Sequence, residues 1–105
     1  MSCMIEIRRT EVFKDWVVNL RDHIAQARIV KRVERLAQGN PGQSRSVGEG
    51  VVELKIDYGP GYRIYYVNRG SVLIVLLCGG DKDSQEKDIV RAKNLAAHLE
   101  LEELI

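Results

Sequence analysis

The alternation of apolar and polar residues on either side of one tight turn constrains the fold more than any other feature. The first stretch reads VVELKID, the second reads YRIYYV, and the turn between them is Tyr58-Gly59-Pro60-Gly61. Side chains of a strand point alternately to the two faces of a sheet. A turn this short makes its flanking strands antiparallel neighbours. Residues 51–67 therefore predict a β-hairpin with one apolar and one polar face.

The polar face of this hairpin gathers two cations and a phenol. Burial of the apolar set predicts that Lys55, Arg63 and Tyr65 emerge together on an open face of the sheet. Positive groups that converge on one patch suit a phosphate. The same face also carries Glu53 and Asp57, so a solvated surface with ordinary salt bridges explains the pattern equally well.

The segment before the hairpin predicts one strand and two helices. Residues 3–8 read as a short strand, and Thr10 suits the N-cap of a helix over residues 11–21. Asp22 can cap a second helix, which the sequence GNPG at 39–42 must end.

Each of these helices carries one apolar stripe at helical spacing. The stripes predict that the two helices form a hairpin on one side of the sheet. Trp16 lies in the first stripe, so we expect a core role for its ring rather than stacking on a nucleic-acid base. The stripes comprise Phe13, Trp16, Val17 and Leu20, followed by Ile24, Ala27, Ile29 or Val30, Val33, Leu36 and Ala37.

The rest of the chain predicts a loop, a strand and a last helix. Residues 39–50 read as an exposed loop, and residues 72–78 as a continuous apolar strand. Asp83 or Ser84 caps the final helix, and Glu86 would complete a capping box with Asp83. The terminal LELEELI could extend this helix, pair as a strand or fray. The predicted order is β-α-α-β-β-β-α, an α+β fold with a mainly antiparallel sheet.

Composition indicates one domain at work in the cytosol. A chain of 105 residues with 45% apolar and 30% charged residues suits a single modest core. No apolar run approaches the roughly 20 residues that span a bilayer, and we expect no secretion signal. Cys3 and Cys78 predict buried thiols in a reducing compartment.

Charge is unevenly distributed along the chain. Residues 1–80 hold 12 Lys and Arg against 8 Asp and Glu, whereas residues 81–105 hold 4 against 7, so the body is locally basic.

Several kinds of catalysis have little support in the sequence. His23 and His98 are the only histidines, and both fall on predicted helices, where we expect structural or surface roles. Neither a catalytic triad nor a metal-dependent nuclease is indicated, and no cofactor motif is present. The candidate chemical groups on the sheet and its corner are Lys55, Arg63, Tyr65, Lys82 and Lys87.

A basic helix face and a basic loop are candidates for RNA contact. The helix face carries Arg28, Lys31, Arg32 and Arg35, and the loop offers Arg45. Such a face can bind phosphates, although it is more often simply solvated. RNA supplies its own nucleophile in the 2′-hydroxyl, so a cluster of Arg and Lys around one phosphate could be sufficient for cleavage.

Two motifs carry a resemblance to a known family. ELKIDYGPGYRIYY and LLCGGDKDSQEKDI resemble the RelE/HigB superfamily of bacterial type II toxin–antitoxin toxins, in the branch labelled addiction module killer protein, and the similarity covers nearly the whole chain. It implies a single RelE-like domain over residues 1–105. It also implies metal-independent cleavage of mRNA on the translating ribosome. The implied partner is an antitoxin of the helix-turn-helix type, held with the toxin in a heteromeric complex.

The resemblance also implies roles for individual residues. Arg63 matches the arginine that stabilises the transition state, Lys55 matches a lysine that is a candidate base or phosphate ligand, and Lys82 matches the basic residue at the corner. Relatives place a Tyr in the final helix, where this chain reads Gln85-Glu86-Lys87-Asp88, with Lys87 as a possible substitute.

Two other functions are open at this point. A ParE-like chain would poison DNA gyrase without catalysis, through its helical hairpin, and would not need the sheet cations. A degenerate toxin would only bind its antitoxin. The coincidence of Lys55, Arg63 and Lys82 favours the nuclease, since only the nuclease requires all three.

Overall fold

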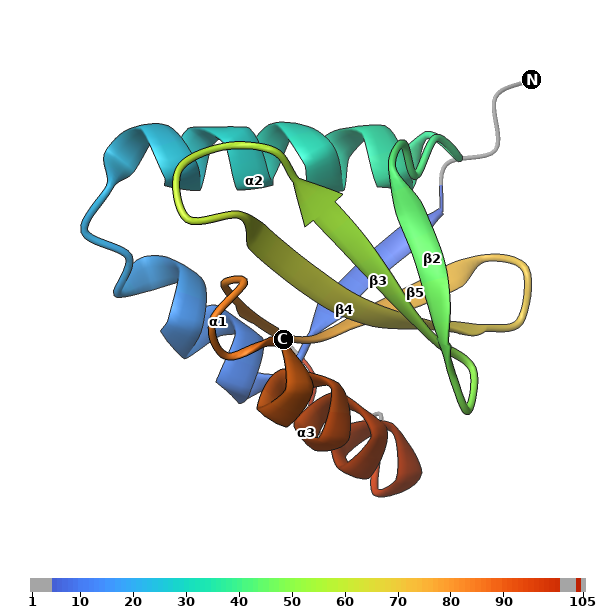
Figure 1. Ribbon diagram of the computed structural model, residues 1–105. Coiled ribbons are helices and arrows are strands. Elements are labelled where there is room, and N and C mark those ends of the chain that lie inside the picture. Colours follow the sequence, from blue (N-terminus) through green and yellow to red (C-terminus); the bar gives the residue numbers. More distant parts are fainter. Residues whose placement is uncertain (1–4, 101–103, 105) are drawn as a thin grey trace.

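A computed structural model describes residues 5–100 and 104. They form one five-stranded sheet and three helices that pack on it (Figure 1). In chain order the elements are β1 Glu6–Arg9, α1 Glu11–Val18, α2 His23–Ala37, β2 Ser44–Gly48, β3 Val51–Ile56, β4 Tyr62–Arg69, β5 Leu73–Gly80 and α3 Gln85–Ala97. The predicted α+β class and the mainly antiparallel sheet are confirmed. The strand order is β1-β5-β4-β3-β2, and only β1, which pairs with β5, is parallel to its neighbour.

Helices cover both faces of the sheet. On the face covered by α1 and α2, the helix residues Phe13, Ile29 and Leu36 pack with the strand residues Leu54 and Ile64. On the other side, Ala92 of α3 packs with the opposite set of strand residues, which are Val51, Tyr65, Val67, Val75 and Leu77. Cys78 joins this side although it directly follows Leu77, because the pairing of β4 with β5 shifts register there. The alternation in β3 and β4 therefore separates two cores, as a period of two requires.

Both predicted helix caps in the N-terminal half are confirmed. The Thr10 hydroxyl oxygen accepts a hydrogen bond from the Phe13 N–H at 3.1 Å. Asp22 Oδ1 accepts from the N–H groups of Ile24 and Ala25 at 2.9 and 3.2 Å. Each cap satisfies amide groups that have no partner within the helix, so each fixes where its helix begins. The first helix ends at Val18, earlier than predicted.

Two predictions about loops and caps are wrong. The segment predicted as an exposed loop contains β2, which pairs with β3. The predicted capping box is absent from the described start of α3. Ser84 is the N-cap residue, but it makes no side-chain cap, and its hydroxyl donates to Asp88 Oδ2 instead. The terminal residues 101–103 and 105, like Cys3, lie outside the described part of the chain.

The buried stripe of α2 differs in part from the prediction. Of the two predicted alternatives, Ile29 is buried and Val30 is 52% exposed. Ala25, which the prediction did not include, is buried, whereas the predicted Ile24 is 60% exposed. The helix therefore turns a slightly different face to the sheet than the periodicity suggested. Leu36 and Ala37 are buried as predicted.

The end of β5 packs unusually closely against two helices. A methyl group on Gly79 would overlap the Trp16 ring, which also meets Tyr62 edge-on with ring centroids 6.2 Å apart. A methyl group on Gly80 would overlap the Asp88 carboxylate of α3. The core role predicted for Trp16 is confirmed, and the glycine pair fixes how closely α1 and α3 approach the sheet. Within residues 5–100 and 104, none of the helices has the length and apolar character to cross a membrane.

Candidate functional site

Strand register brings the polar residues of the hairpin together. Arg45 of β2 lies directly opposite Glu53 of β3, and Glu53 lies opposite Tyr65 of β4. Farther along the same strands, Lys55 lies opposite Arg63. Directly opposed residues in a sheet place their side chains about 5 Å apart on the same face. A one-residue slip would send the whole set to the other face, so the apolar core and the site depend on the same register.

Four of these side chains, those of Arg45, Glu53, Lys55 and Arg63, line a pocket of about 430 Å³ beside the start of α3. Its walls come from β2 and the residue before it, from β3 and β4, and from the first residue of α3. They consist of Gln43, Ser44, Arg45, Glu53, Lys55, Arg63 and Gln85. Three cations and one carboxylate give the lining a net positive charge. A positive, concave surface of this size suits one phosphate with part of a nucleotide.

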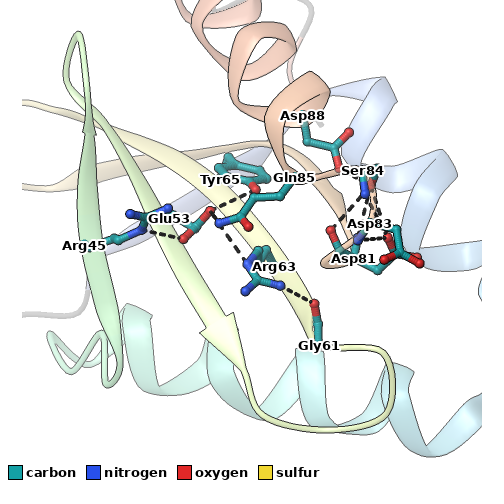
Figure 2. A network of polar contacts seen from close by, with 10 residues as sticks. All are labelled: Arg45, Glu53, Gly61, Arg63, Tyr65, Asp81, Asp83, Ser84, Gln85 and Asp88. Carbon is teal, nitrogen blue, oxygen red and sulfur yellow. Dashed lines mark hydrogen bonds and ion pairs between the residues drawn. The ribbon is translucent and has the colours of Figure 1, made fainter.

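Glu53 is the centre of the polar network in the pocket (Figure 2). The side chain is only 4% exposed, and it accepts hydrogen bonds from Arg45 Nε at 2.8 Å, Gln85 Nε2 at 2.9 Å and the Tyr65 hydroxyl at 3.0 Å. Burial raises the pKa of Glu53, but the hydrogen bonds outweigh burial, so the pKa lies below its ordinary value of 4.5. Glu53 is therefore an ionised carboxylate that holds the Arg45 guanidinium, the Gln85 amide and the Tyr65 hydroxyl in place.

Arg63 is buried but keeps free donors. Its Nη1 donates to the Gly61 carbonyl at 2.7 Å, and its Nε lies 3.8 Å from Glu53 Oε2. Within the described chain, this Nε is the buried side-chain nitrogen or oxygen atom that has no hydrogen-bond partner. The Glu53 carboxylate offsets part of the cost of burying this nitrogen, and the Arg63 side chain also lines the pocket.

The prediction that this face of the sheet is open is wrong in its central part. The Tyr65 side chain is fully buried beneath α3, and Arg63 is 7% exposed. Burial and the neighbouring Glu53 charge raise the pKa of the Tyr65 phenol, so the hydroxyl stays protonated and donates to Glu53. The ring of Tyr65, predicted to bind RNA, offers no surface for stacking, and its hydroxyl contacts Glu53 instead.

The structure places the other two predicted lysines outside the pocket. Lys82 is exposed beside the hairpin turn, where its backbone N–H donates to the Pro60 carbonyl at 3.4 Å. Lys87 lines a separate hollow on α3 with Arg91 and Asn94. The residue of α3 that lines the pocket is Gln85, whereas Lys87, the substitute suggested by the sequence, lies outside it.

Gln85 reaches the pocket because a second polar cluster fixes the start of α3. Asp81 Oδ1 accepts from the N–H groups of Asp83 and Ser84 at 3.0 and 3.1 Å, and the Ser84 hydroxyl donates to Asp88 Oδ2 at 2.5 Å (Figure 2). Asp88 in turn sits against the bare backbone of Gly80. The residues of the GGDKDSQEKD motif therefore mainly fix the start of α3 against the end of β5. Sequence reasoning missed Gln85 because nothing in the local pattern distinguishes it from a surface glutamine.

The basic face of α2 forms a second positive surface, on the other side of the sheet. Arg28, Lys31 and Arg35 are exposed along a groove of about 670 Å³, and the Arg28 guanidinium lies 4.7 Å from the centre of the Tyr58 ring. Arg32 lines the same groove but is used structurally. It donates to the carbonyls of Lys55, Pro41 and Gln43 at 2.6, 3.0 and 3.3 Å, which ties α2 to the start of β2.

Histidine and cysteine take no part in this site. His23 begins α2 and His98 is the C-cap residue of α3, as expected from the sequence. Burial raises the pKa of the Cys78 thiol to about 12. Across residues 5–100 and 104, no group of three His, Cys, Asp or Glu side chains is placed to hold a metal ion.

Comparison with known proteins identifies a family. The family model described as "Phage derived protein Gp49-like (DUF891)" matches residues 15–98, which include every strand of the β2–β5 meander and the whole pocket. The chain is also 48% identical over 97 residues to an uncharacterized protein of Haemophilus influenzae, an alignment that covers 92% of this chain and 98% of the relative. This chain therefore belongs to the Gp49-like family of phage-derived proteins, a family associated with toxin–antitoxin systems.

Proposed function

We propose that the protein is the toxin of a type II toxin–antitoxin module and that it cleaves mRNA without a metal ion. The family association supports the toxin role. The observation that carries the nuclease role is the pocket in which Arg63, Lys55 and Arg45 converge around a buried, ionised Glu53. A protein that acted only through its helical pair would not need three cations that converge in this pocket.

The arrangement suits cleavage by the 2′-hydroxyl of the RNA itself. The 2′-oxygen bonds to phosphorus, its proton passes to water, and the bond from phosphorus to the 5′-oxygen breaks. The leaving 5′-oxygen takes a proton from water, and a 2′,3′-cyclic phosphate is left. Arg63 stabilises the charge on the phosphate oxygens through its free N–H groups, and Lys55 binds the same phosphate from the facing strand. Lys82, beside the turn, is a candidate contact for the neighbouring phosphate.

Positioning would come from a larger assembly. Arg28, Lys31 and Arg35 form a positive strip on α2 that suits the phosphates of structured RNA. A pocket with few catalytic groups depends on correct placement of its substrate, which a translating ribosome provides for mRNA. An antitoxin would then act by covering these surfaces.

The test compares the wild type with Arg63→Ala after induction in growing cells, with the 5′ ends of mRNA mapped across the transcriptome. We expect new ends inside translated regions with the wild type and a decrease of about 100-fold or more with the variant. A thermal unfolding scan of both purified proteins checks that the variant folds. New ends that persist in a folded Arg63→Ala variant would refute the assigned site.

A second function has one observation in its favour. Val18, Ile24 and Val30 of the helical pair are more than half exposed, which suits a protein–protein contact such as the one a gyrase poison makes. In the same experiment, growth arrest with intact mRNA would support that function, and no arrest would support a chain that only binds its antitoxin.

A further inference from the structure

The Gln85 carboxamide has a fixed orientation within the pocket. Gln85 is half-buried at the first position of α3, and its side chain reaches toward Glu53 (Figure 2). The oxygen and nitrogen of an amide are distinguished by their partners. Glu53 is ionised and can only accept hydrogen bonds, so the group 2.9 Å from its Oε2 must be the Gln85 amino group. The carbonyl oxygen Oε1 of Gln85 is thereby turned away from Glu53.

The remaining side chains of the pocket explain why this oxygen matters. Lys and Arg can only donate hydrogen bonds, so Arg45, Lys55 and Arg63 can bind phosphate oxygens but cannot detect a donor on the nucleotide. Gln43 and Ser44 also line the pocket and carry acceptors, but both are exposed, and no charged group fixes their direction. The Glu53 oxygens already accept from Arg45, Tyr65 and Gln85. Gln85 supplies an acceptor whose direction is set by a buried charge.

We propose that Gln85 contacts the substrate, with Oε1 accepting a hydrogen bond from a donor group of the nucleotide whose phosphate lies against Arg63 and Lys55. This proposal rests on the proposed RNA cleavage and adds a residue to it. Two groups of a ribonucleotide supply such a donor, the 2′-hydroxyl and the exocyclic amino group of a base. A site that is built to pair with a donor discriminates strongly against ligands that lack one.

Gln85→Lys separates this role from simple electrostatics. A lysine at this position retains a donor for Glu53 and adds positive charge, but it has no acceptor. If Gln85 only supports Glu53 or the local charge, the variant should bind and cut RNA at least as well as the wild type. If Oε1 contacts the substrate, cutting should fall by about tenfold to a hundredfold despite the added charge.

The pattern of cuts distinguishes the two donors. Purified wild type and Gln85→Lys are added to a translation extract, and the rate of cutting is measured at each mapped site. Loss of contact with the 2′-hydroxyl should lower the rate at every site equally. Loss of contact with a base amino group should instead change which nucleotide is preferred at one position beside the cut.

Two further variants complete the test. Gln85→Met removes both amide groups and should show the same change in cutting, even if the lysine variant unfolds. Asn94→Leu alters an amide on the same helix, outside the pocket, and should cut as the wild type does. Unchanged rates and unchanged preference in folded Gln85→Lys or Gln85→Met would overturn the role of Gln85. Failure of the proposed function gives a different result, because the wild type itself would then make no cuts.

Discussion

The Nε of Arg63 lies 3.8 Å from Oε2 of Glu53, too far for a hydrogen bond, although both side chains are buried. Oε2 is already engaged by the Tyr65 hydroxyl and the Gln85 amide. Arg63 is therefore held near a negative charge without being fully paired to it. This arrangement keeps a guanidinium inside the protein while leaving donors free for a phosphate, and it makes Glu53 responsible for the geometry of the pocket.

Replacing Glu53 should weaken both the fold and the pocket. Glu53→Gln leaves Arg45 and Arg63 without their counter-charge, and we expect the free energy of unfolding to fall by about 1–3 kcal/mol in urea titrations. Glu49→Gln is the matched control, because Glu49 is exposed and lies 3.8 Å from Lys93. The control should change stability by less than about 0.5 kcal/mol. Equal effects of the two substitutions would argue against a central role for Glu53.

Stability should fall in acid because of the same carboxylate. The pKa of Glu53 in the folded chain lies below 4.5, so the folded state favours the ionised form. Its contribution is complete above pH 4.5 and is lost as the pH falls through the lower pKa of the folded chain. The free energy of unfolding should decrease more steeply below pH 4.5 in the wild type than in Glu53→Gln. Parallel curves for the two proteins would contradict the assignment of an ionised Glu53.

Docking of α3 should depend on the absence of a side chain at residue 80. Gly80→Ala places a methyl group against the Asp88 carboxylate, and we expect a loss of about 1–3 kcal/mol in the free energy of unfolding. Because Gln85 lies on the same helix turn, RNA cutting should fall as well. Asp88→Ala in the Gly80→Ala background should recover part of the loss, so the two effects should be less than additive. Full additivity would show that the clash is not between these two residues.

Lys55 should act as a phosphate ligand. Lys55→Arg keeps a positive donor at the same strand position and should retain most of the cutting activity, whereas Lys55→Met should lose about tenfold or more. Initial rates in a translation extract provide the measurement. An arginine variant as inactive as the methionine variant would instead assign proton transfer to Lys55, since arginine cannot be deprotonated.

The basic residues of α2 should divide into two functional classes. In a triple variant, Gln replaces each of Arg28, Lys31 and Arg35. This variant should bind ribosomal RNA more weakly and with less dependence on salt, with little change in stability. Arg32→Gln should lower the free energy of unfolding by about 1–3 kcal/mol, because three carbonyl groups lose their donor. Filter binding over a range of salt concentrations and urea titration measure the two effects. A salt dependence unchanged in the triple variant would remove α2 from the RNA surface.

The elements that the sequence predicts well are those with a strong local cause. Alternation assigned the residues of β3 and β4 to their faces, and Thr10 and Asp22 marked the starts of α1 and α2. β2 was missed because it is an edge strand of mostly exposed residues, so no apolar alternation distinguishes it from a loop. Its pairing with β3 is a tertiary property.

The same distinction applies to the site. The sequence placed Lys55 and Arg63 on one face of the sheet because each falls on the polar side of an alternating strand. The burial of Tyr65 depends on how far α3 extends over the sheet, and the role of Gln85 depends on the cluster that docks that helix. Neither follows from periodicity, because both arise from contacts between elements that are distant in the sequence.

The parallel pairing of β1 with β5 also protects the chain from aggregation. β5 is the most apolar strand, with every residue from Ile74 to Gly80 buried, and β1 covers the edge that the meander leaves open. The pairing joins Glu6 to Leu73, so this edge is closed by a segment from a distant part of the chain. Pairing between residues so distant forms more slowly than the local hairpins of the meander. Until β1 docks, or if proteolysis removes it, β5 presents an apolar strand edge on which further chains can add.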